Sequence, residues 1–420
     1  MKLGVLVPEY PSQTHIFMWR EIEALRELGD QVSVLSTRRP PVEACRHEFA
    51  ASARVETFYA FPPNPARALA TLASRPTATL LALDYLAGLS DRSWRSRVRG
   101  LGLLFCAAEF LRYARRRGLE HIHVHSCAES AHLAALTERL GGPSYSLTLH
   151  GDLPVYGSDH ASKMARATFV STDGPHLREQ ILEATDLPPE RIIPNWMGLD
   201  TERFRDAGRA PGEPGRVRLL SVARLNHSKG HRYALAAMRR VLDEGFDLRY
   251  ILVGEGPDRA HVEHEVRELG ISDRVELKGT CSEAEILDEL NRADVFVLPS
   301  IGIGEAGPIS LMEAMACGLP AVVSIIGATP HMITDGVDGI LVPQADVDGL
   351  ATAFRRLAES PEERRRLGTA ARQRATVQFD IRQTAARIRE AIHCPPGSSA
   401  SSPRASDRMP VETSNAEPLL

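Results

Sequence analysis

The chain has 420 residues, of which 43% are apolar and 25% are charged, and its formal net charge at pH 7 is −4. A chain of this length can bury large hydrophobic cores and corresponds to two or three domains of about 150 residues each. The slight acidic excess argues against nucleic acid as the main partner, because such proteins carry a strongly basic surface. No run reaches the roughly 18 apolar residues that cross a membrane.

The six cysteines lie far apart and form no Cys-x-x-Cys pair: Cys45, Cys106, Cys127, Cys281, Cys317 and Cys394. This spacing argues against a zinc knuckle and against a disulfide-stapled secreted fold, and it favours a reducing compartment. The apolar stretch before Pro8 is too short for the core of a signal peptide. We therefore expect a cytoplasmic protein.

The N-terminal half alternates strands and helices, as in a parallel α/β sheet. Residues 2–7 predict a buried strand, which a loop over residues 8–14 and an amphipathic helix separate from a second strand at residues 31–36. Further strands are predicted at residues 121–125, 145–149 and 168–171, and residues 62–118 are predicted to be mostly helical.

A second α/β set follows a stretch rich in proline, glycine and charge at residues 206–217, which we interpret as a linker. Its strands are predicted at residues 218–222, 250–253, 274–277, 295–298, 321–324 and 340–342. The low-complexity tail at residues 394–420 is predicted to be disordered. The sequence thus predicts two doubly wound domains, at residues 1–205 and 218–375.

Two glutamates flank a predicted helix start in the second domain. Glu305 lies in the loop after the strand at residues 295–298, and Glu313 lies in the helix that begins near Pro308. The free backbone N–H groups of a helix N-terminus suit a phosphate. Carboxylates repel a phosphate, so the two glutamates would instead bind hydroxyl groups on either side of the phosphate. The plainer alternative is two surface glutamates at an ordinary helix start.

A pair of cations precedes this element. Arg224 and Lys229 follow the strand at residues 218–222 and could converge on a diphosphate. Of the 50 basic residues only four are lysines: Lys2, Lys163, Lys229 and Lys278. The alternative is a basic loop that is simply solvated.

In combination these motifs resemble family 4 of the glycosyltransferases, which have the GT-B fold of two Rossmann-like domains facing across a cleft. The resemblance rests on Arg224-x4-Lys229-Gly230, on Glu305-x7-Glu313 and on the EAMACGLP stretch at residues 313–320. It is strong over residues 215–345 and looser in the N-terminal half. The loop after the first strand lacks the glycines common in the family and is more similar to the exopolysaccharide and colanic-acid-type transferases.

The resemblance implies a retaining transfer of a sugar from a nucleotide-diphosphate sugar to a hydroxyl group, without a metal or a cofactor. Arg224 and Lys229 would neutralise the departing diphosphate, Glu313 would bind the ribose hydroxyls, and Glu305 would face the transferred sugar. The backbone around Ala306, Gly307, Pro308 and Ile309 would hold phosphate and sugar. The implied acceptor is a polysaccharide or glycolipid intermediate, or a small molecule.

In the N-terminal half, His150 follows a predicted strand and resembles the histidine that faces the donor sugar in this family. Ser12, Gln13 and Thr14 are weaker candidates for contacts with the substrates. The amphipathic helix at residues 376–393 resembles the last helix of GT-B enzymes, which crosses back to the first domain. Two other functions stay open: a sugar-nucleotide epimerase of the same fold, against which the Glu-x7-Glu element counts, and a sugar-nucleotide sensor without catalysis.

Three further patterns have competing interpretations. His121, His123 and His125 share one face of a strand and could hold a metal, but no acidic partner is evident nearby and a structural role is favoured. The Asp-x-Asp pair at Asp346 is interpreted as a helix cap. Eight arginines at residues 92–117 surround an apolar stretch, so this region is either a solvated helix face or a surface that rests on an anionic membrane.

Overall fold

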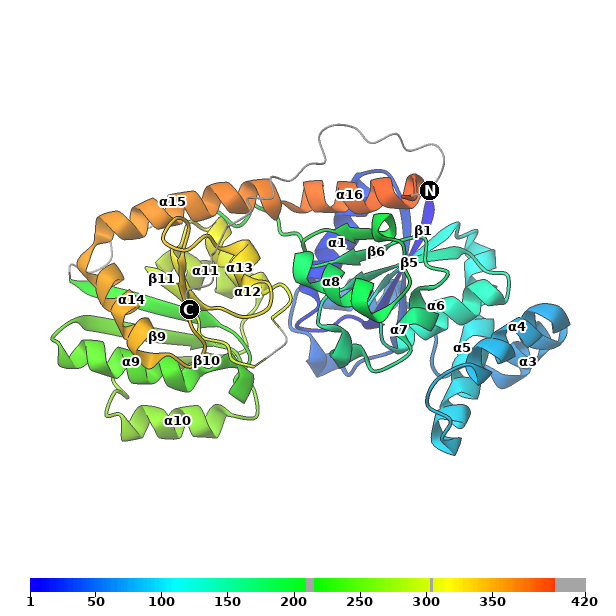
Figure 1. Ribbon diagram of the computed structural model, residues 1–420, viewed down its shortest axis with the longest axis horizontal. Helices are drawn as coiled ribbons and strands as arrows, with labels where there is room; N and C mark the ends of the chain where they lie inside the picture. Colours follow the sequence, from blue (N-terminus) through cyan, green and yellow to red (C-terminus); the bar gives the residue numbers. More distant parts are fainter. Residues whose placement is uncertain (209–214, 303–304, 397–420) are drawn as a thin grey trace, which may run out of the picture.

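The computed structural model describes residues 1–208, 215–302 and 305–396, which form two parallel β-sheets, each flanked by helices (Figure 1). We call the part built on the first sheet the N-terminal domain and the part built on the second sheet the C-terminal domain. The fold class predicted from the sequence, two Rossmann-like α/β domains, is therefore confirmed.

The first sheet has seven parallel strands in the order β3-β2-β1-β4-β5-β6-β7. Its strands are β1 (Lys2–Glu9), β2 (Gln31–Arg38), β3 (Phe58–Tyr59), β4 (His121–His125), β5 (Ser144–Leu149), β6 (Val170–Thr172) and β7 (Ile192–Pro194). Its helices are α1 (Ile16–Glu27), α2 (Ala50–Glu56), α3 (Pro65–Ala73), α4 (Pro76–Ala87), α5 (Trp94–Arg117), α6 (Glu129–Arg139), α7 (His160–Met164) and α8 (Pro175–Ala184). Helices α3 and α4 and the first part of α5 project away from the sheet (Figure 1).

The second sheet has six parallel strands in the order β10-β9-β8-β11-β12-β13. Its strands are β8 (Arg216–Val222), β9 (Asp247–Val253), β10 (Val275–Gly279), β11 (Val295–Leu298), β12 (Ala321–Ser324) and β13 (Ile340–Val342). The helices that follow are α9 (His231–Asp243), α10 (Arg259–Glu268), α11 (Glu283–Arg292), α12 (Ile309–Ala316), α13 (Thr329–Met332), α14 (Val347–Glu359), α15 (Pro361–Gln378) and α16 (Ile381–His393).

The predicted strands are present, with shifts of a few residues at their ends. Strands β11 and β12 are buried along their whole length, as expected of parallel strands covered on both faces. The strand expected at residues 168–171 runs over Val170–Thr172, although the two residues before it already bond to β5: the Thr168 N–H donates to the Tyr145 carbonyl at 2.7 Å, and the Leu147 N–H donates to the Phe169 carbonyl at 3.2 Å. Of the predicted linker, residues 209–214 lie outside the described part of the chain, as do residues 397–420 of the predicted tail.

Both sheets reverse their strand order next to the first strand of each domain. Strand β1 lies between β2 and β4, and β8 lies between β9 and β11. In open parallel sheets the loops at the carboxyl ends of strands part at such a switch point, and ligands bind in the opening. The loops after β1, β8 and β11 are thereby brought to the switch points.

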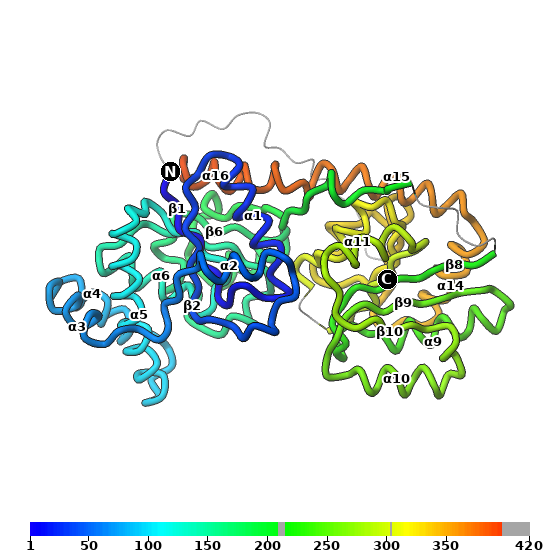
Figure 2. Tube along the Cα trace, turned by 180° about the vertical axis from the view of Figure 1, so that it is seen from behind, coloured from blue at the N-terminus to red at the C-terminus, as the bar shows by residue number. Residues whose placement is uncertain are grey.

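The last helix, α16, packs on the N-terminal domain although it follows the C-terminal domain in sequence (Figure 2). Ile388, Ala391 and Ile392 join a hydrophobic cluster that contains Leu3 and Val5 of β1. An ion pair of 2.9 Å between Arg389 and Asp30 adds a polar contact at the edge of this interface.

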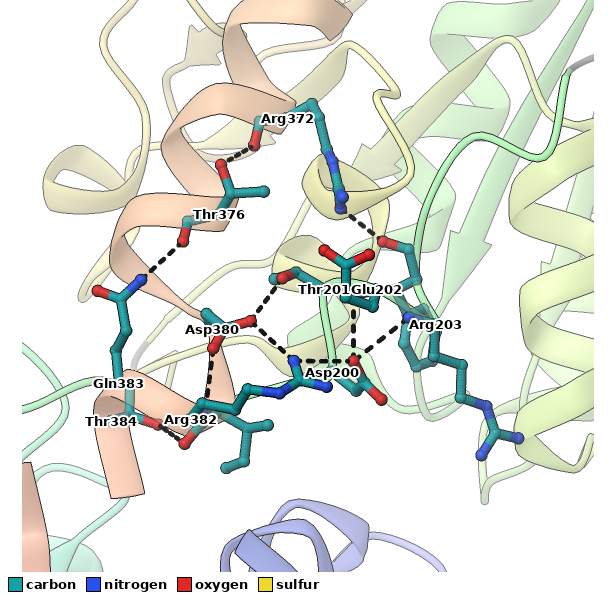
Figure 3. Close-up of polar contacts among 12 residues, drawn as sticks. Asp200, Thr201, Glu202, Arg203, Arg372, Thr376, Asp380, Arg382, Gln383 and Thr384 are labelled. Carbon is teal, nitrogen blue, oxygen red and sulfur yellow. Dashed lines mark hydrogen bonds and ion pairs between the residues drawn. The ribbon is translucent and has the colours of Figure 1, made fainter. Parts of the chain in front are cut away.

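Two segments connect the domains, one after β7 and one between α15 and α16. These connecting segments are hydrogen-bonded to each other (Figure 3). The Leu199 N–H donates to the carbonyl of Phe379, and the Ile381 N–H donates back to the carbonyl of Leu199, both at 2.9 Å. The Thr201 hydroxyl donates to the Asp380 carboxylate at 2.6 Å. The two connecting segments are therefore joined to each other by hydrogen bonds.

The Asp-x-Asp pattern is explained by the fold alone. Asp346 is the N-cap of α14, and its carboxylate accepts from the N–H of Gly349 at 2.8 Å, which is the predicted capping role. The eight arginines at residues 92–117 are all exposed, along α5 and in the turn before it. Within the described residues, no helix combines the length and hydropathy needed to span a bilayer.

Candidate active site

A cleft of about 620 Å³ lies between the domains, lined by residues that follow strands of both sheets. The N-terminal domain contributes, among others, Gln13, Thr14, His15, Phe17, Arg20 and His150, and the C-terminal domain contributes Arg224, Lys229, Glu305, Gly307, Pro308, Ile309 and Glu313. The structure thus brings together nearly all the site residues predicted from the sequence. Ala306 differs, because its side chain is buried among apolar residues of the N-terminal domain.

The loop after β8 carries the two predicted cations. Gly230 has a positive φ of 62°, and a Cβ at this position would lie 1.9 Å from the carbonyl oxygen of Pro299, so only glycine lets the loop approach the end of β11 this closely. The approach is fixed by the Ile301 N–H, which donates to the Ser228 carbonyl at 2.8 Å. As a result the Lys229 ammonium forms an ion pair with the Glu305 carboxylate, while Arg224 is exposed at the cleft.

Glu305 is held on several sides. The Ser300 hydroxyl donates to the same carboxylate oxygen that meets Lys229, at 2.7 Å, and the Glu305 carbonyl accepts from the Ala328 N–H at 2.8 Å. The side chain is only 7% exposed. Because Pro308 has no N–H, the backbone donors available around the start of α12 are those of its neighbours, Gly307 and Ile309 among them.

Glu313 lies in the second turn of α12 and is bound by a residue that the sequence did not single out. Arg20 of α1 donates to Glu313 and to Glu283 of α11, at 2.7 Å in each case. The Arg20 side chain is 5% exposed, so this is a buried bridge between the two domains. Burial raises the pKa of Glu313, and Arg20 opposes the rise.

His150 follows β5 and is fixed by a chain of polar contacts. Its Nδ1 lies 2.8 Å from the Asp173 carboxylate, and its Nε2 lies 3.0 Å from His125 Nδ1. If Asp173 is ionised, it accepts from Nδ1, which leaves Nε2 to accept from His125. Phe17 packs edge-on against the imidazole with ring centroids 4.7 Å apart. Burial raises the pKa of the Asp173 carboxyl, and His150 opposes the rise.

Sequence analysis missed Arg20, Asp173 and Phe17 as parts of this site. One signal was available for two of them: Phe17 and Arg20 are three residues apart and so share a face of α1. Of the weaker candidates, Gln13 and Thr14 line the cleft, and the Gln13 amide donates to the carbonyl of Cys281 at 3.1 Å. The loop after β1 therefore contacts both domains.

Residues 203–374 match the family model described as Glycosyl transferases group 1. The chain is 37% identical over 183 residues to the putative colanic acid biosynthesis glycosyltransferase WcaL of Salmonella typhimurium, which covers 42% of this chain and 44% of that protein. It is 35% identical over 207 residues to the amylovoran biosynthesis glycosyltransferase AmsK of Erwinia amylovora, which covers 47% and 50%. The chain thus spans about half the length of the curated relatives it matches.

Among solved structures, Anabaena Alr3699/HepE in complex with UDP is similar with a TM-score of 0.72 and 15% identity, over 94% of this chain and all of that one. A likeness at this identity concerns the fold, and it agrees with the two facing Rossmann-like sheets described above. Residues 203–374 therefore belong to the glycosyl transferases group 1 family, within a chain that has the GT-B fold.

Proposed function

We propose that this protein is a retaining glycosyltransferase that moves a sugar from a nucleotide-diphosphate sugar to a hydroxyl of a polysaccharide or glycolipid intermediate. The observation that carries the proposal is the interdomain cleft, where Arg224, Lys229, Glu305 and Glu313 meet His150 of the other domain. Two cations suit a diphosphate, and carboxylates suit the hydroxyl groups of ribose and sugar. A donor bound here would have its anomeric carbon between the domains.

In the proposed reaction the acceptor oxygen forms a bond to the anomeric carbon while the bond from that carbon to the diphosphate oxygen breaks. The acceptor proton passes to the departing diphosphate, and both events occur on one face of the sugar. Lys229 and Arg224 stabilise the negative charge that develops on the leaving group. Because Lys229 is paired with Glu305, donor binding requires this ammonium to be shared with a phosphate oxygen. In this proposal the two cations take the place of a metal at the diphosphate.

The relatives support the substrate class. WcaL is named a putative colanic acid biosynthesis glycosyltransferase and AmsK an amylovoran biosynthesis glycosyltransferase, and Alr3699/HepE was crystallised with UDP and with UDP-glucose. We accordingly propose a uridine-linked donor and an acceptor from exopolysaccharide synthesis.

The first experiment is a thermal-shift panel of UDP, GDP and ADP with and without EDTA, on the wild type, on Glu313→Ala and on Glu268→Ala as a control at an exposed site of α10. Binding to the folded state raises Tm. We expect UDP, and not GDP or ADP, to raise Tm by several degrees in the wild type and in the control, with the shift lost in Glu313→Ala and unchanged by EDTA.

Turnover assays with the matching nucleotide sugar then separate the candidate functions. Release of nucleotide that depends on an added acceptor supports the transferase. Donor conversion without an acceptor indicates an epimerase, and a Tm shift without any turnover indicates a sensor; either of these results would contradict the proposal, as would the absence of a shift with every nucleotide.

We further propose that the helices projecting from the N-terminal domain rest on an anionic membrane that carries the acceptor. Exposed apolar side chains gather there next to the arginines: Leu69, Leu80, Leu81, Trp94, Val98 and Leu101, each at least 49% exposed. Apolar side chains beside cations are the pattern of interfacial binding, and each cation near the surface contributes about 1 kcal/mol.

This membrane contact predicts co-sedimentation with vesicles that contain phosphatidylglycerol and not with vesicles of phosphatidylcholine alone. Replacing Arg95 and Arg97 together by glutamate should lower the bound fraction at least tenfold, because two attractive charges become repulsive. The matched control, Arg249→Glu with Arg267→Glu, changes two exposed arginines of the C-terminal domain. Equal binding of both double variants would show that the projecting helices are not the contact.

A further inference from the structure

Three side chains that could bind a metal converge beneath His150. His123 and His125 lie on one face of β4, and both side chains are fully buried. Glu21 comes from α1, about a hundred residues earlier, and its side chain is 13% exposed. Sequence analysis found no acidic partner for these histidines; that expectation was wrong, because the partner belongs to a distant helix.

The separations of the ligand atoms suit a tetrahedral ion. Glu21 Oε1 lies 3.3 Å from His125 Nε2 and 3.7 Å from His123 Nε2, and all three atoms lie within 4.8 Å of one another. Two atoms that are each about 2.1 Å from a tetrahedral zinc ion lie about 3.4 Å apart. Small side-chain adjustments would therefore place all three atoms on one ion.

Two of the three atoms have no hydrogen-bond partner in the structure. Glu21 Oε1 and His125 Nε2 are buried, and although they lie 3.3 Å apart, neither is in hydrogen-bonding geometry with the other or with another described group. Leaving such atoms buried without a partner is costly, and most buried polar atoms in proteins have one. A cation bound between these two atoms and His123 Nε2 would supply the missing partner of both.

The other nitrogen of each histidine is held as metal ligands usually are. His123 Nδ1 lies 2.8 Å from the Ser146 hydroxyl, and His125 Nδ1 lies 3.0 Å from His150 Nε2. His123 Nε2 also lies 2.9 Å from the Thr148 hydroxyl, a bond that metal binding would replace.

We propose that Glu21, His123 and His125 form a binding site for a divalent transition metal, of which zinc best matches two imidazoles and one carboxylate. Two neutral imidazoles and one carboxylate give the ion a single compensating charge, and a water held by Thr148 can complete four ligands. The ion would hold His125 with its proton on Nδ1, so that His150 Nε2 accepts from it. The site is separate from the diphosphate site and does not depend on the proposed function.

The test uses untagged full-length protein with Cys394→Ser, since Cys394 is an exposed thiol next to His393 that could bind metal on its own. Metal content is measured by mass spectrometry after purification and again after adding one equivalent of zinc and desalting. Co²⁺ titration followed by its visible absorption reports the ligand geometry. We expect about one metal ion per chain and a tetrahedral Co²⁺ spectrum.

Glu21→Gln and His125→Ala should each lower metal affinity at least 100-fold. The matched control is His121→Gln, on the same face of β4, because the His121 ring already bonds to Ser144 and Ser146 through its two nitrogens. Circular dichroism checks that each variant folds. Absence of stoichiometric metal in the wild type, or equal Co²⁺ binding by Glu21→Gln and His121→Gln, would overturn the proposal and leave a proton shared between Glu21 and His125 as the explanation.

Discussion

Replacing Lys229 by methionine is expected to weaken binding of the nucleoside diphosphate by about 10- to 100-fold, and to lower turnover further. A hydrogen bond to a charged group contributes about 1.5–3 kcal/mol, and each 1.4 kcal/mol is a factor of ten in affinity. The variant also leaves Glu305 without its ion-pair partner, so that its carboxylate faces the incoming phosphates. Isothermal titration with the nucleotide identified in the thermal-shift panel measures the loss.

Glu305→Gln should behave in the opposite way. It keeps the shape of the side chain and the contact with Ser300, so nucleotide affinity should change little, whereas turnover should fall about 100-fold because the charge beside the reacting sugar is lost. The double variant Lys229→Met with Glu305→Gln should regain part of the affinity that Lys229→Met loses and stay inactive. Lys278→Met is the control, because Lys278 pairs with Glu289 in the same domain and does not line the cleft. Equal affinity in all these variants would contradict the assigned roles.

Replacing Arg20 by methionine is expected to lower the free energy of unfolding by about 3–5 kcal/mol, the usual result of removing one partner from a buried ion pair. The loss arises because the carboxylates of Glu283 and Glu313 stay buried without the guanidinium that bonds both of them. Chemical denaturation followed by circular dichroism gives the value. Arg26→Met, on the solvent side of the same helix, should cost less than about 1 kcal/mol.

The loss of unfolding free energy in Arg20→Met should depend on pH. Burial raises the pKa of Glu313 in the folded protein, and Arg20 opposes the rise, so the variant raises it further. A carboxyl whose folded pKa lies above its unfolded value destabilises the fold at neutral pH, and the penalty disappears once the pH falls below the unfolded pKa of about 4.3. The difference between wild type and variant should thus shrink from pH 7 toward about pH 4. A deficit that grows on acidification would show that the two carboxylates are not its cause.

The parts of the site that could be predicted from the sequence are those fixed by strand order. Arg224, Lys229 and Glu305 follow strands β8 and β11, which are neighbours at a switch point. That these residues lie close together therefore follows from the alternation of strands and helices and from the family motifs. His150 follows β5 in the same way. Asp173 follows β6, the neighbour of β5 in the sheet, so its contact with His150 could have been predicted by the same argument. Glu21 and Arg20 could not be predicted in this way, because they lie on a helix whose partners are set by tertiary packing: Arg20 bonds to residues 263 and 293 positions away.

The placement of α16 has a consequence for synthesis on the ribosome. The N-terminal domain lacks Ile388, Ala391 and Ile392 of its hydrophobic cluster until almost the entire described chain has been translated. The C-terminal domain, from β8 through α15, is continuous in sequence and leaves the ribosome before α16 does. Domains commonly fold in the order in which they are made. Here the domain translated second can finish folding first, and the domain translated first waits for its last helix.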